Sequence, residues 1–433
     1  MAPQLTDAGA SARSRIAWRL LPFLFLLYVA NYLDRTNIAY AALGMKGDLR
    51  LTDSVFGTAS GIFFVGYLLL QIPGALLVER WSAKLLLAGT LIAWGALTVL
   101  TGLVRTPAEL YGARFFLGVA EAAFFPAVIV YFSRWFTYQD RAKAVARFMS
   151  AIPVAAIIGG PLAGAILGVN WLGLPGWRWL FFVEGVPAVL LGIATLFVLP
   201  DRPNDARWLR ADERNWLAAR LAEERQAKAD VAEMTTWRAV RSWRVVLLTA
   251  ALLCCYSGGY AFWFWMPTML QRLTGWSDVQ RIGWISSIPF LAGLIGMLLV
   301  GWNSDRTAER RWHFAVPQLT AAAALVAWLF LPHSDALLIA VFTLVGFGTS
   351  AHLPAFWALP TTFLSASAAA AAIGFINCIA SIGGFFGPKL IGTLSERTGS
   401  FDAGFVFMST CLVIGSVLVL LCPRERRLIR NGA

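Results

Sequence analysis

The chain has 433 residues, of which 58% are hydrophobic and only 14% are charged, and its formal net charge is +12. This apolar share is too high for a soluble domain of that length, and it indicates a polytopic all-α membrane protein. The basic surplus raises the question of nucleic-acid binding. However, most Lys and Arg residues fall in a few connections between apolar runs, which favours a topology signal instead.

Twelve apolar runs are long enough to cross a bilayer, at about 20 residues each. The first follows a polar N-terminus and is interrupted by charge, so it is predicted to be a retained span without a cleaved signal. Basic residues gather at both termini and in the even-numbered connections, which predicts cytoplasmic termini in the inner (plasma) membrane. The predicted spans are 17–42, 55–78, 84–104, 109–132, 143–168, 179–199, 245–270, 282–302, 313–332, 335–358, 367–394 and 402–422.

Residues 200–243 form the longest polar segment between two spans. Asn204 or Asp205 is a suitable N-cap for a helix that continues to about Lys228. We therefore predict an N-terminal six-helix half (1–199), a cytoplasmic linker with a helix (200–243) and a C-terminal six-helix half (244–433).

Two pairs of markers indicate that the halves are repeats. The acid-Arg pairs Glu79-Arg80 and Asp305-Arg306 lie 226 residues apart, and Gly160-Pro161 and Gly387-Pro388 lie 227 apart. Parallel repeats of this kind place a substrate site near the bilayer midplane, where the halves meet.

Four charged residues lie well inside the first and fourth predicted spans, where charge is costly and usually functional. Asp34 and Arg35 fall in the first span, and Arg114 and Glu121 share one face of the fourth. By helical rise, Arg35 lies about 26 Å beyond Trp18, and Glu121 lies about 21 Å from the outer end of its span. We expect the arginines to bind an anion, since the guanidinium fork matches a carboxylate.

The charges of these four residues sum to zero when both acids are ionised. A bound carboxylate adds one uncompensated negative charge in a poorly hydrated site, and uptake of a proton restores neutrality. Asp34 and Glu121 are therefore predicted to carry protons. The alternative is a structural ion-pair network that holds spans one and four together.

Other candidates have weaker signals. Glu184 opens the sixth span, which suits a structural or gating role, and Glu79, Arg80, Asp305 and Arg306 are expected to control the inner gate. The second half lacks counterparts of the four charges, so we expect it to provide shape and hydrogen bonding. Its candidates, together with Tyr67 of span two, are Tyr256, Tyr260, Trp357 and Asn377, while His352 is expected to serve packing.

The acid-Arg loops resemble the loop motif of the major facilitator superfamily, although Glu79, Ser82 and Ala75 depart from it. Five stretches resemble its anion:cation symporter branch, which includes phthalate, 4-hydroxyphenylacetate, tartrate and galactonate transporters. In that branch, positions matching Arg35 and Arg114 engage the anion, and those matching Asp34 and Glu121 carry protons. The stretches are NYLDRTNIAYA, GYLLLQIPGALLVERW, GARFFLGVAEAAFFPAVIVYFSRWF, GWRWLFFVEGVPA and GFINCIASIGGFFGP.

We therefore predict a monomeric proton-coupled symporter that imports a small organic anion, either an aromatic carboxylate or a hydroxy or sugar acid, by alternating access. A proton-antiport exporter is the first alternative, because Gly160-Pro161 partly matches an antiporter motif. A non-transporting receptor or scaffold is the second. No enzyme activity, cofactor, metal site or nucleic-acid partner is expected. The five cysteines, all in apolar runs, are expected to be small core residues.

Overall fold

The computed structural model describes residues 2–229, 241–364 and 366–423, and within these ranges every regular element is helical. Eleven helical segments of this part are long and apolar enough to cross a membrane. The expected twelfth span corresponds to α13 (Arg311–Trp328), in which Arg311, His313 and Gln318 lower the mean hydropathy. The twelve-span all-helical fold predicted from the sequence is confirmed.

Contacts between helices divide the chain into two units. Unit 1 comprises residues 1–232 and 276–287, and unit 2 comprises residues 233–275 and 288–433. The linker helix thus belongs to unit 1, as do the first turns of α12 (Val279–Thr307). The other elements of unit 1 are α1 (Ala2–Asp48), α2 (Asp53–Arg80), α3 (Ala83–Thr101), α4 (Pro107–Glu121), α5 (Phe124–Trp135), α6 (Tyr138–Met149), α7 (Ala151–Leu167), α8 (Gly176–Val198), the short 3-10 helix η1 (Pro203–Asp205) and α9 (Ala211–Ala229).

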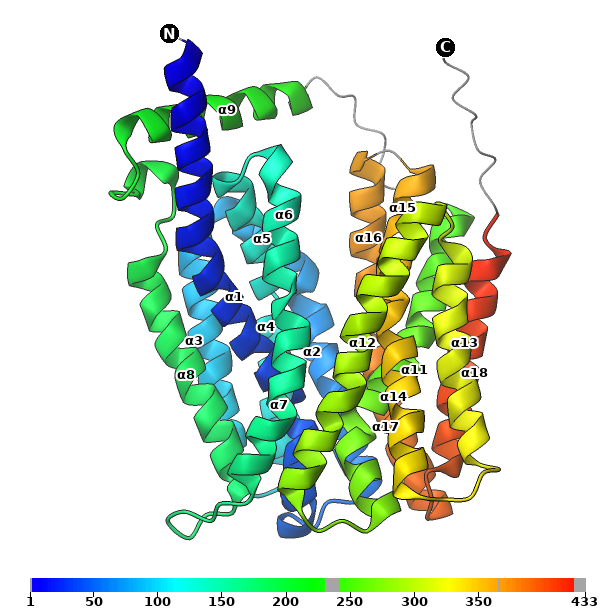
Figure 1. Cartoon of the computed structure of the whole chain (residues 1–433). Helices are drawn as coiled ribbons and strands as arrows, with labels where there is room; N and C mark the ends of the chain where they lie inside the picture. Colours follow the sequence, from blue (N-terminus) through cyan, green and yellow to red (C-terminus); the bar gives the residue numbers. More distant parts are fainter. Residues whose placement is uncertain (1, 230–240, 365, 424–433) are drawn as a thin grey trace. The chain divides into compact units, whose positions relative to one another are not determined.

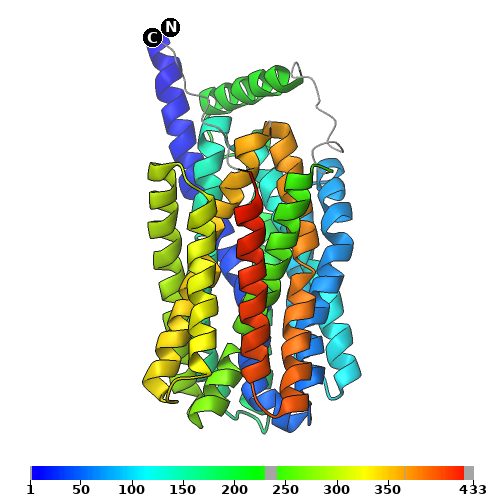
Figure 2. The ribbon, with the colours of Figure 1, turned by 90° about the vertical axis from the view of Figure 1, so that its right-hand side faces the viewer.

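Unit 2 contains the remaining helices, which Figure 1 shows in green to red. Figure 2 turns α17 and α18 toward the viewer, and both pack on α11. Besides α13, these elements are α11 (Trp243–Thr274), α14 (Asp335–Ala351), α15 (Leu353–Phe363), α16 (Ala366–Ala380) and α17 (Gly383–Thr398), followed by α18 (Asp402–Leu421).

Four of the predicted spans are interrupted helices, and the interruptions occur at corresponding places in the two units. The α4–α5 break follows Glu121 and the α14–α15 break follows Ala351, 230 residues later. Likewise, α6 ends at Met149 and α16 ends at Ala380. Broken spans of this kind commonly accompany transport sites, because the freed backbone groups are satisfied only inside the protein.

Helices α2 and α4 pack at backbone distance through two glycines. A Cβ atom on Gly118 would lie 2.0 Å from the Phe63 carbonyl oxygen, and one on Gly66 would lie 2.1 Å from the Phe115 carbonyl oxygen. No larger residue fits without moving a helix. This contact sets the position of Phe63 and Tyr67 relative to Arg114.

Replacing Gly118 by leucine is expected to destabilise the protein by at least the roughly 1–3 kcal/mol that is typical of overpacking. This loss corresponds to a decrease of several degrees in the melting temperature. Gly112→Ala is the matched control, because a Cβ there meets no atom within 4 Å. Equal melting temperatures for the two variants in detergent would contradict this packing.

The linker helix is docked on the N-terminal end of α1 (Figure 1). Glu213 is fully buried there, and it accepts hydrogen bonds from Ser11 Oγ at 2.7 Å and from the Arg210 backbone N–H at 2.9 Å. The helix begins at Ala211, later than predicted. Asn204 and Asp205, the two candidates for its N-cap, lie instead in the η1 turn, where Asp205 accepts the Arg202 N–H at 3.1 Å.

The docking of α9 is expected to depend on the ionised form of Glu213. Burial raises the pKa of this carboxyl group, but the bonds from Ser11 and Arg210 and the charges of Arg15 and Arg210 outweigh it and leave the pKa lowered. A lowered pKa gives stabilisation that is complete above the ordinary value of about 4.3 and is lost as the pH falls through the folded-state pKa. Glu213→Gln should therefore speed amide exchange in residues 211–224 at neutral pH. Glu223→Gln, whose side chain is 63% exposed, should leave it unchanged.

Candidate functional site

Two residues of the candidate site, Arg114 and Glu121, lie on α4. Thr106 accepts the Glu109 backbone N–H and Pro107 occupies the first turn, so the helix starts at a strong cap. Seven residues separate Arg114 from Glu121, which places both on one face. Both are buried, and Glu121 is the last residue of the helix, at the break before α5.

Glu121 is joined to Arg35 of α1 by a forked contact. Arg35 Nη2 donates to Glu121 Oε2 at 2.9 Å, and Arg35 Nε donates to the same oxygen at 3.3 Å. The other oxygen, Oε1, is buried and has no hydrogen-bond partner among the described residues. Arg35 therefore binds one carboxylate oxygen of Glu121, and the other oxygen accepts no hydrogen bond from the described residues.

Arg114 is a fully buried arginine in α4. Its side chain is completely buried, and none of its three guanidinium nitrogens has a hydrogen-bond acceptor in the part of the chain that the structure describes. Its guanidinium carbon lies 5.1 Å from the centre of the Phe63 ring. A cation–π contact of this kind compensates only part of the lost hydration. A buried charged donor group of this kind can bind a ligand, an ion or water that supplies the acceptors.

Phe63 and Tyr67 of α2 bring the two arginines together. The guanidinium carbon of Arg35 lies 5.3 Å from the Phe63 ring centre and 5.1 Å from that of Tyr67. Both arginines thus contact the Phe63 ring. The sequence analysis named Tyr67 but missed Phe63, because an apolar side chain in an apolar span gives no sign of a functional role.

Asp34 lies one residue before Arg35 and points to a different set of neighbours. It is fully buried, its Oδ1 accepts a hydrogen bond from Asn37 Nδ2 at 3.5 Å, and its Oδ2 has no partner among the described residues. Unit 1 thus brings together all four charged residues predicted from the sequence. Arg35 pairs with Glu121, whereas Arg114 has no hydrogen-bond acceptor among the described residues.

The candidates in unit 2 form a separate polar and aromatic cluster. Tyr256 Oη donates to Asn377 Oδ1 at 3.5 Å, and the Tyr256 and Tyr260 rings meet edge to face at 5.3 Å. Trp357 packs with Tyr256 against the apolar core of this unit. His352 stands at the α14–α15 break, and its Nδ1 lies 3.2 Å from the Gly348 carbonyl oxygen.

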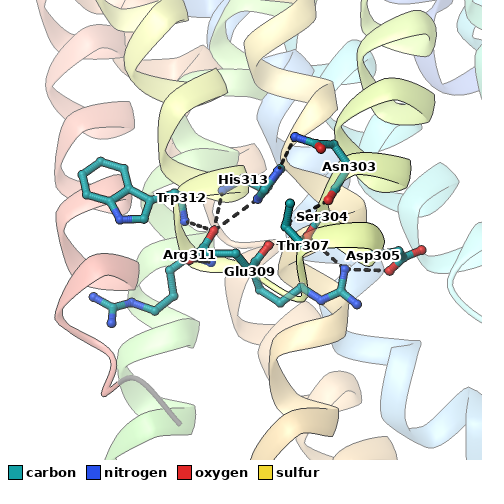
Figure 3. Close-up of polar contacts among 9 residues, drawn as sticks. Asn303, Ser304, Asp305, Thr307, Glu309, Arg311, Trp312 and His313 are labelled. Atoms are coloured by element: carbon teal, nitrogen blue, oxygen red, sulfur yellow. Dashed lines mark hydrogen bonds and ion pairs between the residues drawn. The ribbon is translucent and has the colours of Figure 1, made fainter. Parts of the chain in front are cut away.

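The last turn of α12 contains two of the predicted gating residues, Asp305 and Arg306, and Figure 3 shows the first of them. Asp305 pairs with Arg310, in the connection to α13, at 2.6 Å, and Arg306 lies over the Trp302 ring at 5.6 Å. Within unit 2 both residues therefore contact neighbours that are close in sequence. Their counterparts Glu79 and Arg80 lie outside the described side chains, so the gating role of all four remains a prediction.

A chain that crosses the membrane many times and buries opposed charges in its spans has the features of a membrane transport protein. The family model "Major Facilitator Superfamily" matches residues 24–388. The chain belongs to this superfamily, and it is accordingly a transporter and not an enzyme.

Three comparisons describe its relatives. A protein of Agrobacterium vitis that is named as a tartrate transporter is 40% identical over 97% of this chain and 96% of its own. A quinolone resistance transporter of Acinetobacter baumannii is 35% identical over 94% and 93%. The crystal structure of a bacterial homologue of the human lysosomal transporter Spinster superposes with a TM-score of 0.75 over 93% and 94% at 19% identity, which supports the fold alone.

Proposed function

We propose that this protein imports a small organic anion together with protons across the inner membrane, with both termini in the cytoplasm. The observation that carries the proposal is the buried guanidinium of Arg114, which lacks acceptors among the described residues. A carboxylate supplies such acceptors in the right planar geometry, and a charged hydrogen bond in a water-poor site is strong.

The Arg35–Glu121 pair gives a reason for proton coupling. An incoming carboxylate competes with Glu121 for Arg35, which is only 18% exposed. Two carboxylates on one side chain repel each other, and protonation of Glu121 releases Arg35 to the substrate. Binding of the anion and of the proton are thereby linked in the direction of symport.

The identity of the anion rests on the relatives and on unit 2. The relative named for tartrate favours a hydroxy acid. The aromatic and amide groups of Tyr256, Tyr260, Trp357 and Asn377 suit hydroxyl or ring contacts, and we propose that they select among anions. We further propose that the protein acts as a monomer.

Uptake into vesicles that contain the purified protein tests the function directly. Labelled tartrate, phthalate and galactonate would each be offered with and without an inward proton gradient, and gradient-dependent accumulation of at least one is expected. Equal uptake of every acid in protein-free vesicles would contradict the proposal.

Proton-antiport export is the second candidate, since one relative is named for quinolone resistance. It predicts extrusion of a drug from energised cells and no anion accumulation. The buried guanidinium of Arg114 favours the anion, because a carboxylate supplies the acceptors that Arg114 lacks among the described residues.

A further inference from the structure

Glu184 of α8 was expected to serve structure or gating, yet it lies with the charged residues of α1. The residue is only 8% exposed, and its Oε2 is buried without a hydrogen-bond partner among the described residues. The Asn37 side chain lies near the same carboxyl group. Asn37 also reaches Asp34, at 3.5 Å. One amide thus stands between two buried carboxyl groups.

Helix register places Glu184 there independently. Helices α1 and α8 run antiparallel, and a Cβ on Gly44 would lie 3.5 Å from the Trp177 ring. Asn37 precedes Gly44 by seven residues in α1, and Glu184 follows Trp177 by seven residues in α8, which is about two turns in each helix. Because the helices are antiparallel, Asn37 and Glu184 therefore lie at the same level. Asp34 lies on the same face of α1, about one turn before Asn37 and further from the end of the helix at Asp48.

These groups form a line between the anion site and one end of unit 1. That end is marked by Trp177 Nε1, which donates to Asp48 Oδ2 at 3.0 Å. By helical rise, Glu184 lies about 12 Å from the start of α8, whereas Asp34 lies about 21 Å from the end of α1. Among the carboxyl groups of Asp34, Glu121 and Glu184, that of Glu184 therefore lies nearest to this end.

The charge balance requires a proton in this group. The titratable groups that face it are Asp34 and Tyr40 of α1 and Arg114 and Glu121 of α4, with Arg35 bound to Glu121. Two guanidinium groups face three carboxyl groups, so full ionisation leaves one negative charge without compensation. Placing a charge of that kind in a poorly hydrated interior is expensive, and a proton shared by Asp34 and Glu184 removes it.

We infer that Glu184 is a third proton-carrying group and that Glu184, Asn37 and Asp34 form the proton path between the anion site and the Asp48 end of unit 1. A proton leaves the Glu184 carboxyl group and adds to the Asp34 carboxylate. Glu184 is then ionised and takes a new proton from water at that end. Asn37 is a positioning residue that holds the two carboxyl groups beside each other.

This inference rests on the proposed proton coupling, and the Glu184→Gln variant tests it. In vesicles with a pH gradient of one unit, the tartrate accumulation ratio of this variant should fall about tenfold, while tartrate exchange without a gradient should stay within about twofold of the wild type. Glu109→Gln, an exposed glutamate on α4, is the matched control and should behave as the wild type. Asn37→Leu keeps all three carboxyl groups and should slow accumulation alone.

Infrared difference spectra upon hydrogen–deuterium exchange provide a measurement that needs no transport. The anion-free wild type and Glu109→Gln should show the C=O stretch of a buried protonated carboxyl group, and Glu184→Gln should lose intensity there. If the wild type accumulates no anion, the proposed function fails, and the infrared signal still tests the proton on this group. Unchanged accumulation or an unchanged infrared band in Glu184→Gln would overturn the inference, as would equal loss of exchange and accumulation.

Discussion

Replacing Arg114 by alanine is expected to weaken anion binding about 100-fold, with a smaller loss of stability than the removal of a paired buried charge causes. Two charged hydrogen bonds to a carboxylate contribute about 3 kcal/mol or more together, which corresponds to a factor of this size. Arg114→Lys keeps the charge but loses the planar fork, so a weakening of about tenfold is expected.

Stability distinguishes the anion role from the structural alternative. Removing one partner of a buried ion pair typically destabilises a protein by about 3–5 kcal/mol. Arg114 has no hydrogen-bonded partner among the described residues, so its removal breaks no hydrogen bond, and the anion-free protein is expected to lose less stability than this. Arg105→Ala, an exposed arginine in front of α4, is the matched control for both measurements. A lower melting temperature with unchanged anion affinity would show that Arg114 belongs to a structural network.

Replacing Glu121 by glutamine should uncouple anion transport from protons. A pH gradient of one unit sustains up to about tenfold accumulation for one coupled proton, because one unit corresponds to about 1.4 kcal/mol. In Glu121→Gln this ratio should fall to about one. Exchange of labelled for unlabelled anion should persist, because the glutamine amide mimics the protonated acid and leaves Arg35 available.

Glu121→Asp keeps a titratable group at the same place and is the matched control. It should retain accumulation at a reduced rate, since the shorter side chain lengthens the contact with Arg35. Wild-type accumulation by Glu121→Gln would remove Glu121 from the proton path. Loss of exchange as well would point to a role in folding or conformational change.

Much of the N-terminal site could be predicted from the sequence because charge inside an apolar run is conspicuous. Asp34, Arg35, Arg114 and Glu121 stand out against their neighbours, and the seven-residue spacing in α4 already places two of them on one face. Phe63 could not be found in this way, since it is one of 30 phenylalanines. Its contact with both arginines depends on the close approach of α2 and α4 at Gly66 and Gly118.

The sequence by itself determined the twelve-span helical fold and the four charged positions, because hydropathy and helical periodicity are local properties of the chain. Only the tertiary structure decided which charges pair, since that depends on how helices distant in sequence are packed. Arg35 binds Glu121, Arg114 remains without an acceptor among the described residues, and Asn37 donates to Asp34. The sequence analysis assigned Glu184 a structural or gating role because it lies near the start of a span. The register of α1 against α8 instead places this carboxyl group beside the buried residues Asp34 and Asn37.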